Sequence, residues 1–135
     1  MKNFKTLIPT LLILFAVTAC SSGPSMEDGL WEMTSTMEME GMPNGMPPMT
    51  YRLCLTKDNM VPTQQRRNQD CEKIEQDISG DTVTWRMRCT TNGAVSDMNG
   101  SSTYSGDTMK GTMQMTSGSM QMTSRITGKR LGPCK

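Results

Sequence analysis

The chain has 135 residues, of which 14 are Lys or Arg, 13 are Asp or Glu and none is histidine. A net charge of +1 excludes the strongly basic surface that nucleic-acid-binding proteins use, so no nucleic-acid partner is expected. Without histidine, Ser-His-Asp and Cys-His nucleophilic sites and the usual zinc and non-haem iron sites are excluded as well. We therefore expect no enzymatic activity. The unusual feature of the composition is its 16 methionines.

The N-terminus is predicted to be a secretory signal. Lys2 and Lys5 form a short basic region, and the apolar run Leu7 to Ala16 follows it. Small residues come next, as they do before a cleavage site. The apolar run is shorter than the roughly 20 residues that a transmembrane helix needs. The segment is therefore expected to be removed from the mature protein.

The signal ends in "VTAC", which resembles a bacterial lipobox, where the cysteine becomes the first mature residue and carries lipid. We therefore expect lipid on Cys20. Several acyl chains on this one residue would anchor the protein stably in a membrane. Ser21 follows, where an aspartate would resemble an inner-membrane retention signal, so we expect an outer membrane lipoprotein facing the periplasm. The predicted organisation is a signal peptide at 1–19, a lipid-anchored tether at 20–28 and a single β domain at 29–135.

Apolar and polar residues alternate along most of the remaining chain, which indicates half-buried strands. Between residues 31 and 39 the odd positions include Trp31, Met33, Met37 and Met39, and the even positions hold Glu and Thr. The same alternation recurs at residues 49–55, 83–89, 109–115 and 120–126. Thr56–Gln69 departs from it, because this segment is polar, contains Pro62 and has room for one short helical turn.

Turn signals separate these runs. "SGDT" occurs at Ser79–Thr82 and at Ser105–Thr108, and Ser117-Gly118 offers a third tight turn. Glycine suits such hairpins because it accepts positive φ angles. The sequence thus predicts an all-β fold, a single antiparallel meander of about seven strands that curls into a small barrel or bent sheet.

Two hairpin registers place methionines on one face. The hairpins are centred on Gly106-Asp107 and on Ser117-Gly118. The predicted cross-strand pairs are Met98–Met115, Met115–Met120 and Met113–Met122. These side chains would form one apolar patch that has to be buried. We therefore expect Met113, Met115, Met120 and Met122 to be mainly structural and to bind no metal.

Four cysteines follow Cys20, and an even number in a small exported domain indicates two disulfides. A hairpin about Gly80-Asp81 brings Cys71 and Cys89 to its open end, and a bulge near Cys71 would place them directly opposite each other. This favours Cys71–Cys89 and leaves Cys54 to pair with Cys134. The alternative, Cys54–Cys71 with Cys89–Cys134, remains open.

Four stretches in order, "GLWEMTSTMEM", "CLTKDN", "SGDTVTWRMRC" and "GKRLGPC", resemble a bacterial family catalogued as domain-of-unknown-function family 3617. The resemblance covers nearly all of the mature chain. It implies a small exported β domain rich in Met and Thr, often a lipoprotein. It implies no activity, cofactor or catalytic residue.

The sequence favours a non-catalytic binding or structural module of the cell envelope, attached to a membrane by its lipid and contacting an envelope protein or the cell wall. One alternative is a carrier of an apolar or lipid ligand, because methionine-lined surfaces adapt to varied apolar partners. A second alternative is a periplasmic Cu(I)-binding protein, because thioethers are soft ligands. Its candidate ligands lie in and beside a Pro- and Gly-rich loop: Met39, Met42, Met46 and Met49. No resident cofactor is expected.

Overall fold

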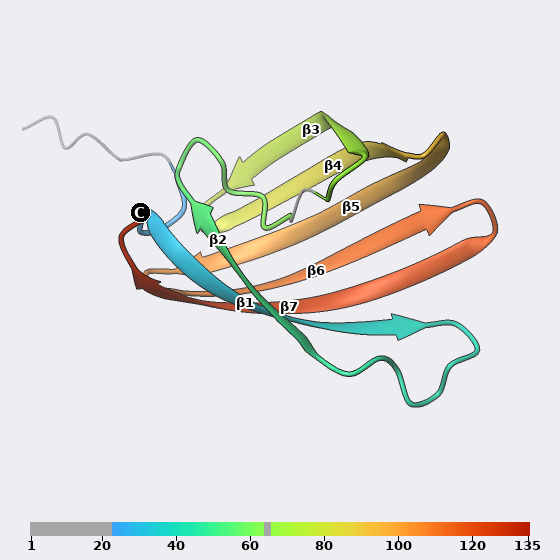
Figure 1. Cartoon of the computed structure of the whole chain (residues 1–135). Helices are drawn as coiled ribbons and strands as arrows, with labels where there is room; N and C mark the ends of the chain where they lie inside the picture. Colours follow the sequence, from blue (N-terminus) through green and yellow to red (C-terminus); the bar gives the residue numbers. More distant parts are fainter. Residues whose placement is uncertain (1–22, 64–65) are drawn as a thin grey trace, which may run out of the picture.

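In the computed structural model, residues 23–63 and 66–135 are described, and they form one antiparallel sheet of seven strands (Figure 1). The strands are β1 (Gly29–Met39), β2 (Met49–Leu55), β3 (Gln69–Ser79), β4 (Thr82–Thr91), β5 (Ala94–Ser105), β6 (Thr108–Ser117) and β7 (Met120–Gly132). The predicted all-β fold class is confirmed. In this part of the chain, no helix has the length and apolarity needed to cross a membrane.

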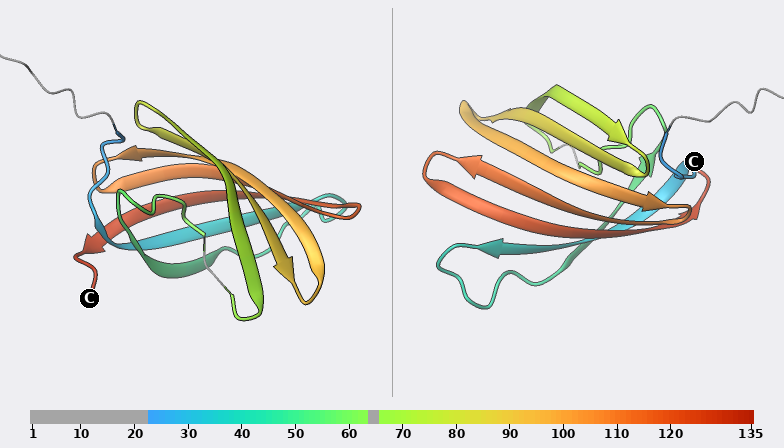
Figure 2. Two further views of the ribbon diagram at one scale, coloured as in Figure 1. Left: turned by 90° about the horizontal axis from the view of Figure 1, so that it is seen from above. Right: turned by 180° about the vertical axis from the view of Figure 1, so that it is seen from behind.

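The sheet is a half-barrel in which the first and last strands pair with each other. Its order is β2-β1-β7-β6-β5-β4-β3, so β7 pairs with β1 while β2 and β3, which are consecutive in the chain, form the two edges. Figure 2 shows the sheet curling so that these edge strands rise on either side of its inner face. The opening of the half-barrel therefore lies between β2 and β3.

The two hairpins on either side of β6 test the predicted registers. Met98 stands opposite Met115, as the turn at Gly106-Asp107 predicts. In the β6–β7 hairpin, however, Met115 stands opposite Met122 and Met113 opposite Ser124, so the predicted Met115–Met120 and Met113–Met122 pairings are both wrong by two residues. The turn begins one residue later than predicted, with Gly118 at a φ of 60° in its first position. A shift of two residues keeps each side chain on its face, so Met113, Met115 and Met122 still share one face. Met120, however, is 54% exposed, so its expected burial is wrong.

A bulge in β3 places the cysteines of the β3–β4 hairpin. The register shifts between Lys73 and Glu75, so that Cys71 stands directly opposite Cys89. Cys71 and Cys89 form a disulfide, and Cys54 and Cys134 form another across 80 residues of sequence. The pairing favoured from the sequence is confirmed.

One end of the half-barrel, here called the closed end, holds the densest part of the core. Trp31 and Tyr104 pack edge to face with ring centroids 5.9 Å apart. The N-terminal segment 24–28 adds Met26, which is 3% exposed, and the loop after β2 adds the buried residues 60–62. The hydroxyl of Tyr104 donates to the Met60 carbonyl, which fastens this loop to β5. The loop was expected to be polar, yet it supplies core residues.

Two glycines on the inner face make room for large side chains. A Cβ atom on Gly128 would lie 2.6 Å from Met33 Sδ, and one on Gly100 would lie 2.6 Å from the Trp85 ring. Both distances are too short for real atoms, so glycine is required where Met33 and Trp85 cross the neighbouring strand.

Candidate functional site

A row of five methionines crosses the inner face of the sheet at right angles to the strands. Each stands directly opposite the next in the strand register. This methionine row consists of Met39 on β1, Met122 on β7, Met115 on β6, Met98 on β5 and Met87 on β4. Directly opposite residues have their Cβ atoms about 5 Å apart and point to the same side. The row is therefore one continuous band of thioether side chains.

The methionine row is only partly covered. Met98 is 9% exposed and the other four are half-buried. Tyr104 lies six residues further along β5, which corresponds to about 20 Å. The segments that cover Tyr104 therefore belong to the other end of the strands. The row lies near the open end, which holds the β1–β2 connection and the β4–β5 and β6–β7 turns (Figure 1).

The surroundings of the row are partly apolar and partly polar. The sulfur atoms of Cys89 and Met98 are 3.6 Å apart, so the Cys71–Cys89 disulfide packs beside the row. On the side toward the closed end, Met37 and Met113 flank Ser124. The hydroxyl of Ser124 is paired with that of Ser35 at 2.6 Å. Methionine side chains are flexible and polarizable, so this band suits irregular apolar partners.

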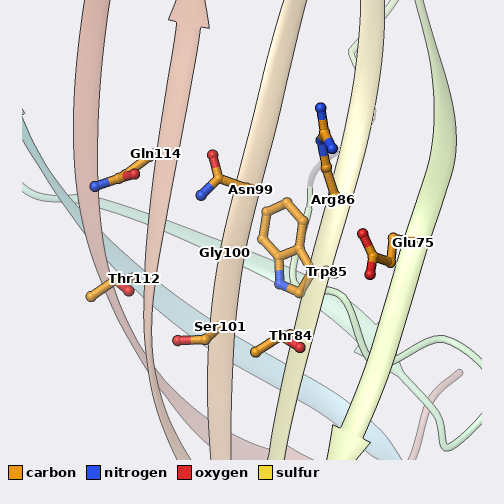
Figure 3. Close-up of a pocket in the computed structure, with 9 residues that line it drawn as sticks. All are labelled: Glu75, Thr84, Trp85, Arg86, Asn99, Gly100, Ser101, Thr112 and Gln114. Atoms are coloured by element: carbon orange, nitrogen blue, oxygen red, sulfur yellow. The ribbon is translucent and has the colours of Figure 1, made fainter.

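The outer face carries a different feature, a shallow polar pocket of about 460 Å³ over β3 to β6 (Figure 3). Its lining residues on the outer face are Glu75, Thr84, Arg86, Asn99, Ser101, Thr112 and Gln114, and the inner-face residues Trp85 and Gly100 border it as well. Strand register puts Arg86 between Glu75 and Asn99. These groups donate and accept hydrogen bonds, but they include no histidine and no thiol that would act as a nucleophile. The pocket therefore offers hydrogen-bonding groups to a polar ligand.

Burial affects four polar groups near these surfaces. Within residues 23–63 and 66–135, Trp85 Nε1 and Ser102 Oγ are buried without a hydrogen-bond partner. Burial also raises the pKa of the Tyr104 phenol well above its ordinary value. The pKa of Tyr51 is raised for the same reason, and its hydroxyl donates to the Pro62 carbonyl at 3.1 Å. Both phenols donate hydrogen bonds to the loop that covers them.

Comparison with known proteins identifies a family. The profile described as "Protein of unknown function (DUF3617)" matches residues 26–134. The chain belongs to the DUF3617 family. No curated protein and no solved structure gives a significant match to it. The resemblance noted from the four sequence stretches is thus confirmed, and the family brings no activity to carry over to this chain.

The copper candidates of this DUF3617 protein lie in different surroundings. Met39 belongs to the half-buried row, whereas Met42, Met46 and Met49 are 48%, 38% and 40% exposed. Turn hydrogen bonds connect Met42 to the Met39 carbonyl and Met46 to the Met37 carbonyl, each at 3.1 Å. In residues 23–63 and 66–135, no three His, Cys, Asp or Glu side chains gather as a metal site would require. Copper binding by these thioethers stays an untested alternative.

Two other predicted features concern the N-terminus. Cys20, the expected lipidation site, lies outside the described residues. The expected tether, 20–28, reaches into the fold, because Met26 forms a bridge with Gly106 and is buried. The family match also begins at residue 26. The end of the expected tether is therefore part of the β domain.

The sequence did not reveal the methionine row as a unit. Only the Met98–Met115 step was predicted correctly, because the β6–β7 register was misplaced and the β1–β7 pairing was not foreseen. The spacing of apolar residues along the strands does carry a signal. Met39, Met87 and Met122 each lie on the apolar side of an alternating strand. A pairing of β1 with β7 aligns Met39 with Met122, and the β4–β5 register aligns Met87 with Met98.

Proposed function

We propose that this DUF3617 protein is a non-catalytic lipoprotein of the cell envelope that binds apolar ligands on the inner face of its half-barrel. The observation that supports this most directly is the methionine row, in which five thioether side chains stand in register and four are half-buried. Apolar surface that is left partly accessible gains free energy when a ligand covers it. The sequence supports the non-catalytic part, since it has no histidine.

The ligand-binding part is tested with the neutral apolar dye N-phenyl-1-naphthylamine, whose fluorescence rises in apolar surroundings. The probe variant is Met115→Gln/Met122→Gln, which keeps side-chain length and adds polarity in the row. The matched control is Met42→Gln/Met46→Gln in the exposed loop. We expect at least about a tenfold loss of dye affinity in the row variant, equivalent to about 1.4 kcal/mol, and no change in the control.

A third variant separates apolar binding from copper binding. Met115→Leu/Met122→Leu keeps apolar volume and removes two sulfur atoms, at a stability cost below about 1.5 kcal/mol per site. Dye affinity should stay within about threefold of the wild type. A wild-type protein that binds no dye, or equal dye binding by the row variant and the control, contradicts the proposal. Urea unfolding of every variant checks that the sheet is intact.

The lipoprotein part is tested independently. Metabolic labelling with palmitate should label the wild-type protein and not Cys20→Ala. Membrane fractionation should then find the labelled protein in the outer membrane. Label that persists in Cys20→Ala disproves the anchor, whereas labelled protein in the inner membrane disproves only the sorting.

A further inference from the structure

The methionine row ends at a cation. On β3, Lys73 stands directly opposite Met87, the last methionine of the row. Cys71 lies two residues earlier and faces Cys89 on the inner side of the sheet. By alternation Lys73 faces the same side. The inner face thus carries a continuous track from Met39 on β1 to Lys73 at the β3 edge.

The β3 bulge keeps acidic groups off this side of the strand. Ile74 is the extra residue, and after it Gln76 stands opposite Trp85 on the inner face while Glu75 stands opposite Arg86 on the outer face. The ammonium of Lys73 donates to Gln76 Oε1 at 3.0 Å, which is consistent with both side chains sharing the inner face. Among the described residues, no carboxylate oxygen lies within 4.0 Å of the Lys73 ammonium nitrogen, the limit for an ion pair.

The edge position leaves the ammonium in water. β3 is an edge of the sheet, at the opening of the half-barrel, and Lys73 is exposed. A ligand that lies along the track therefore keeps one end solvated beside Lys73 and its remaining length against the thioethers. That arrangement fits a molecule with one anionic end and one unbranched apolar chain.

We propose that the track binds a long-chain carboxylate, with its alkyl chain on the methionine row and its carboxylate beside Lys73. The inference rests on the proposed apolar binding and adds the class of ligand and its direction. From Met39 to Met87 the track spans four strand spacings of about 4.8 Å, or about 19 Å. An extended alkyl chain of about 15 carbons has a similar length, given C–C bonds of about 1.5 Å.

The test uses two 14-carbon ligands, myristate, which has an anionic carboxylate end, and tetradecanol, which has a neutral hydroxyl end. Each displaces N-phenyl-1-naphthylamine from the mature chain carrying Cys20→Ala, which avoids detergent and keeps every described residue. Lys73→Gln should weaken myristate binding about tenfold and leave tetradecanol binding within about twofold. Met115→Gln/Met122→Gln should weaken both ligands. The control is Lys110→Gln on β6, an exposed lysine opposite Thr103 and Thr127, which should change neither.

The outcomes separate this inference from the proposed function. Equal affinity of the wild type for both ligands, together with no effect of Lys73→Gln, overturns the role of Lys73 and leaves apolar binding intact. A wild-type protein that binds neither ligand overturns both. An edge lysine also discourages strand addition between molecules. A Lys73→Gln protein that only aggregates faster, with unchanged myristate affinity, therefore contradicts the proposal.

Discussion

The two ends of the half-barrel share one pattern of alternation but differ in what covers them. At the closed end, Trp31 and Tyr104 are essentially fully buried, because the N-terminal segment and residues 60–62 lie over them. At the open end, Met115 and Met122 stay half-buried on the same inner face. An apolar strand face is therefore not by itself a core, since its role depends on what chain segments pack on it.

Side-chain choice follows this difference. The covered end uses rigid aromatic groups whose polar atoms have fixed partners, such as Trp31 Nε1 donating to the Glu27 carbonyl at 3.1 Å. Methionine is present at both ends, since Met26 and Met33 are buried at the closed end, but the row at the open end consists of methionine alone. Methionine has more rotatable bonds and no strong hydrogen-bonding atom. Such side chains tolerate both contact with water and contact with a bound partner.

The disulfides give the largest expected contrast between the two ends. Cys54–Cys134 closes 80 residues beside the closed end, and Cys71–Cys89 closes 18 residues beside the methionine row. Restriction of the unfolded chain predicts a loss of about 4 to 5 kcal/mol for Cys54→Ala/Cys134→Ala and about 3 kcal/mol for Cys71→Ala/Cys89→Ala. Urea unfolding of both double variants measures the two losses. A larger loss for the shorter loop would show that packing of the sulfur atoms, rather than chain restriction, dominates.

Truncation of a methionine at each end gives the next contrast. Met33 is fully buried and packs over Gly128, so Met33→Ala should lower the free energy of unfolding by about 2 to 5 kcal/mol. Met122 is half-buried, so Met122→Ala should cost clearly less than Met33→Ala. Chemical denaturation measures both values. Equal costs would mean that the open end is packed as tightly as the closed end.

The smallest expected effect is a pH dependence of the free energy of unfolding, which arises at the closed end alone. Burial raises the pKa of Tyr104 and of Tyr51, whereas an unfolded tyrosine titrates near about 10. Above that pH the unfolded chain releases phenol protons that the folded chain retains. The free energy of unfolding should therefore fall by up to about 1.4 kcal/mol per pH unit for each tyrosine.

Denaturation at successive pH values above 10 measures this slope, and Tyr104→Phe should reduce it. The stability contribution is complete below the unfolded pKa and is lost as the pH rises toward the folded pKa. An unchanged slope in Tyr104→Phe would show that Tyr104 is not the titrating group.

Local features of the fold could be predicted from the sequence. Alternation located most strands, "SGDT" located two turns, and the hairpin about Gly80-Asp81 favoured the Cys71–Cys89 pair. These features depend on residues close together in the chain, where turn chemistry and side-chain period act directly. The error in the β6–β7 hairpin arose because Gly118 suits either position of a two-residue turn.

Long-range features could not be predicted in this way. The pairing of β1 with β7 joins residues about a hundred positions apart, and no local pattern encodes it. The burial of Met60 likewise depends on the hydroxyl of Tyr104, far away in the sequence. The candidate site could not be predicted for the same reason. The methionine row depends on the β1–β7 pairing. The position of Lys73 at the end of the row depends on the β3 bulge, and the alternation of residues did not place this bulge.

The attachment of the N-terminal segment has a consequence for orientation. The backbone of Ser25 donates to Asp81 Oδ1 at 2.7 Å, and the Met26–Gly106 bridge fixes the next residue to the β5–β6 turn. Gly23, the first described residue, lies beside Met26 and Gly106 at the closed end, so a lipid anchor upstream of it would be attached at this end. A lipidated protein would thus stand on its closed end, with the methionine row turned away from its own leaflet. An amphiphile bound there would be exchanged with the aqueous compartment, not drawn directly from the membrane beneath.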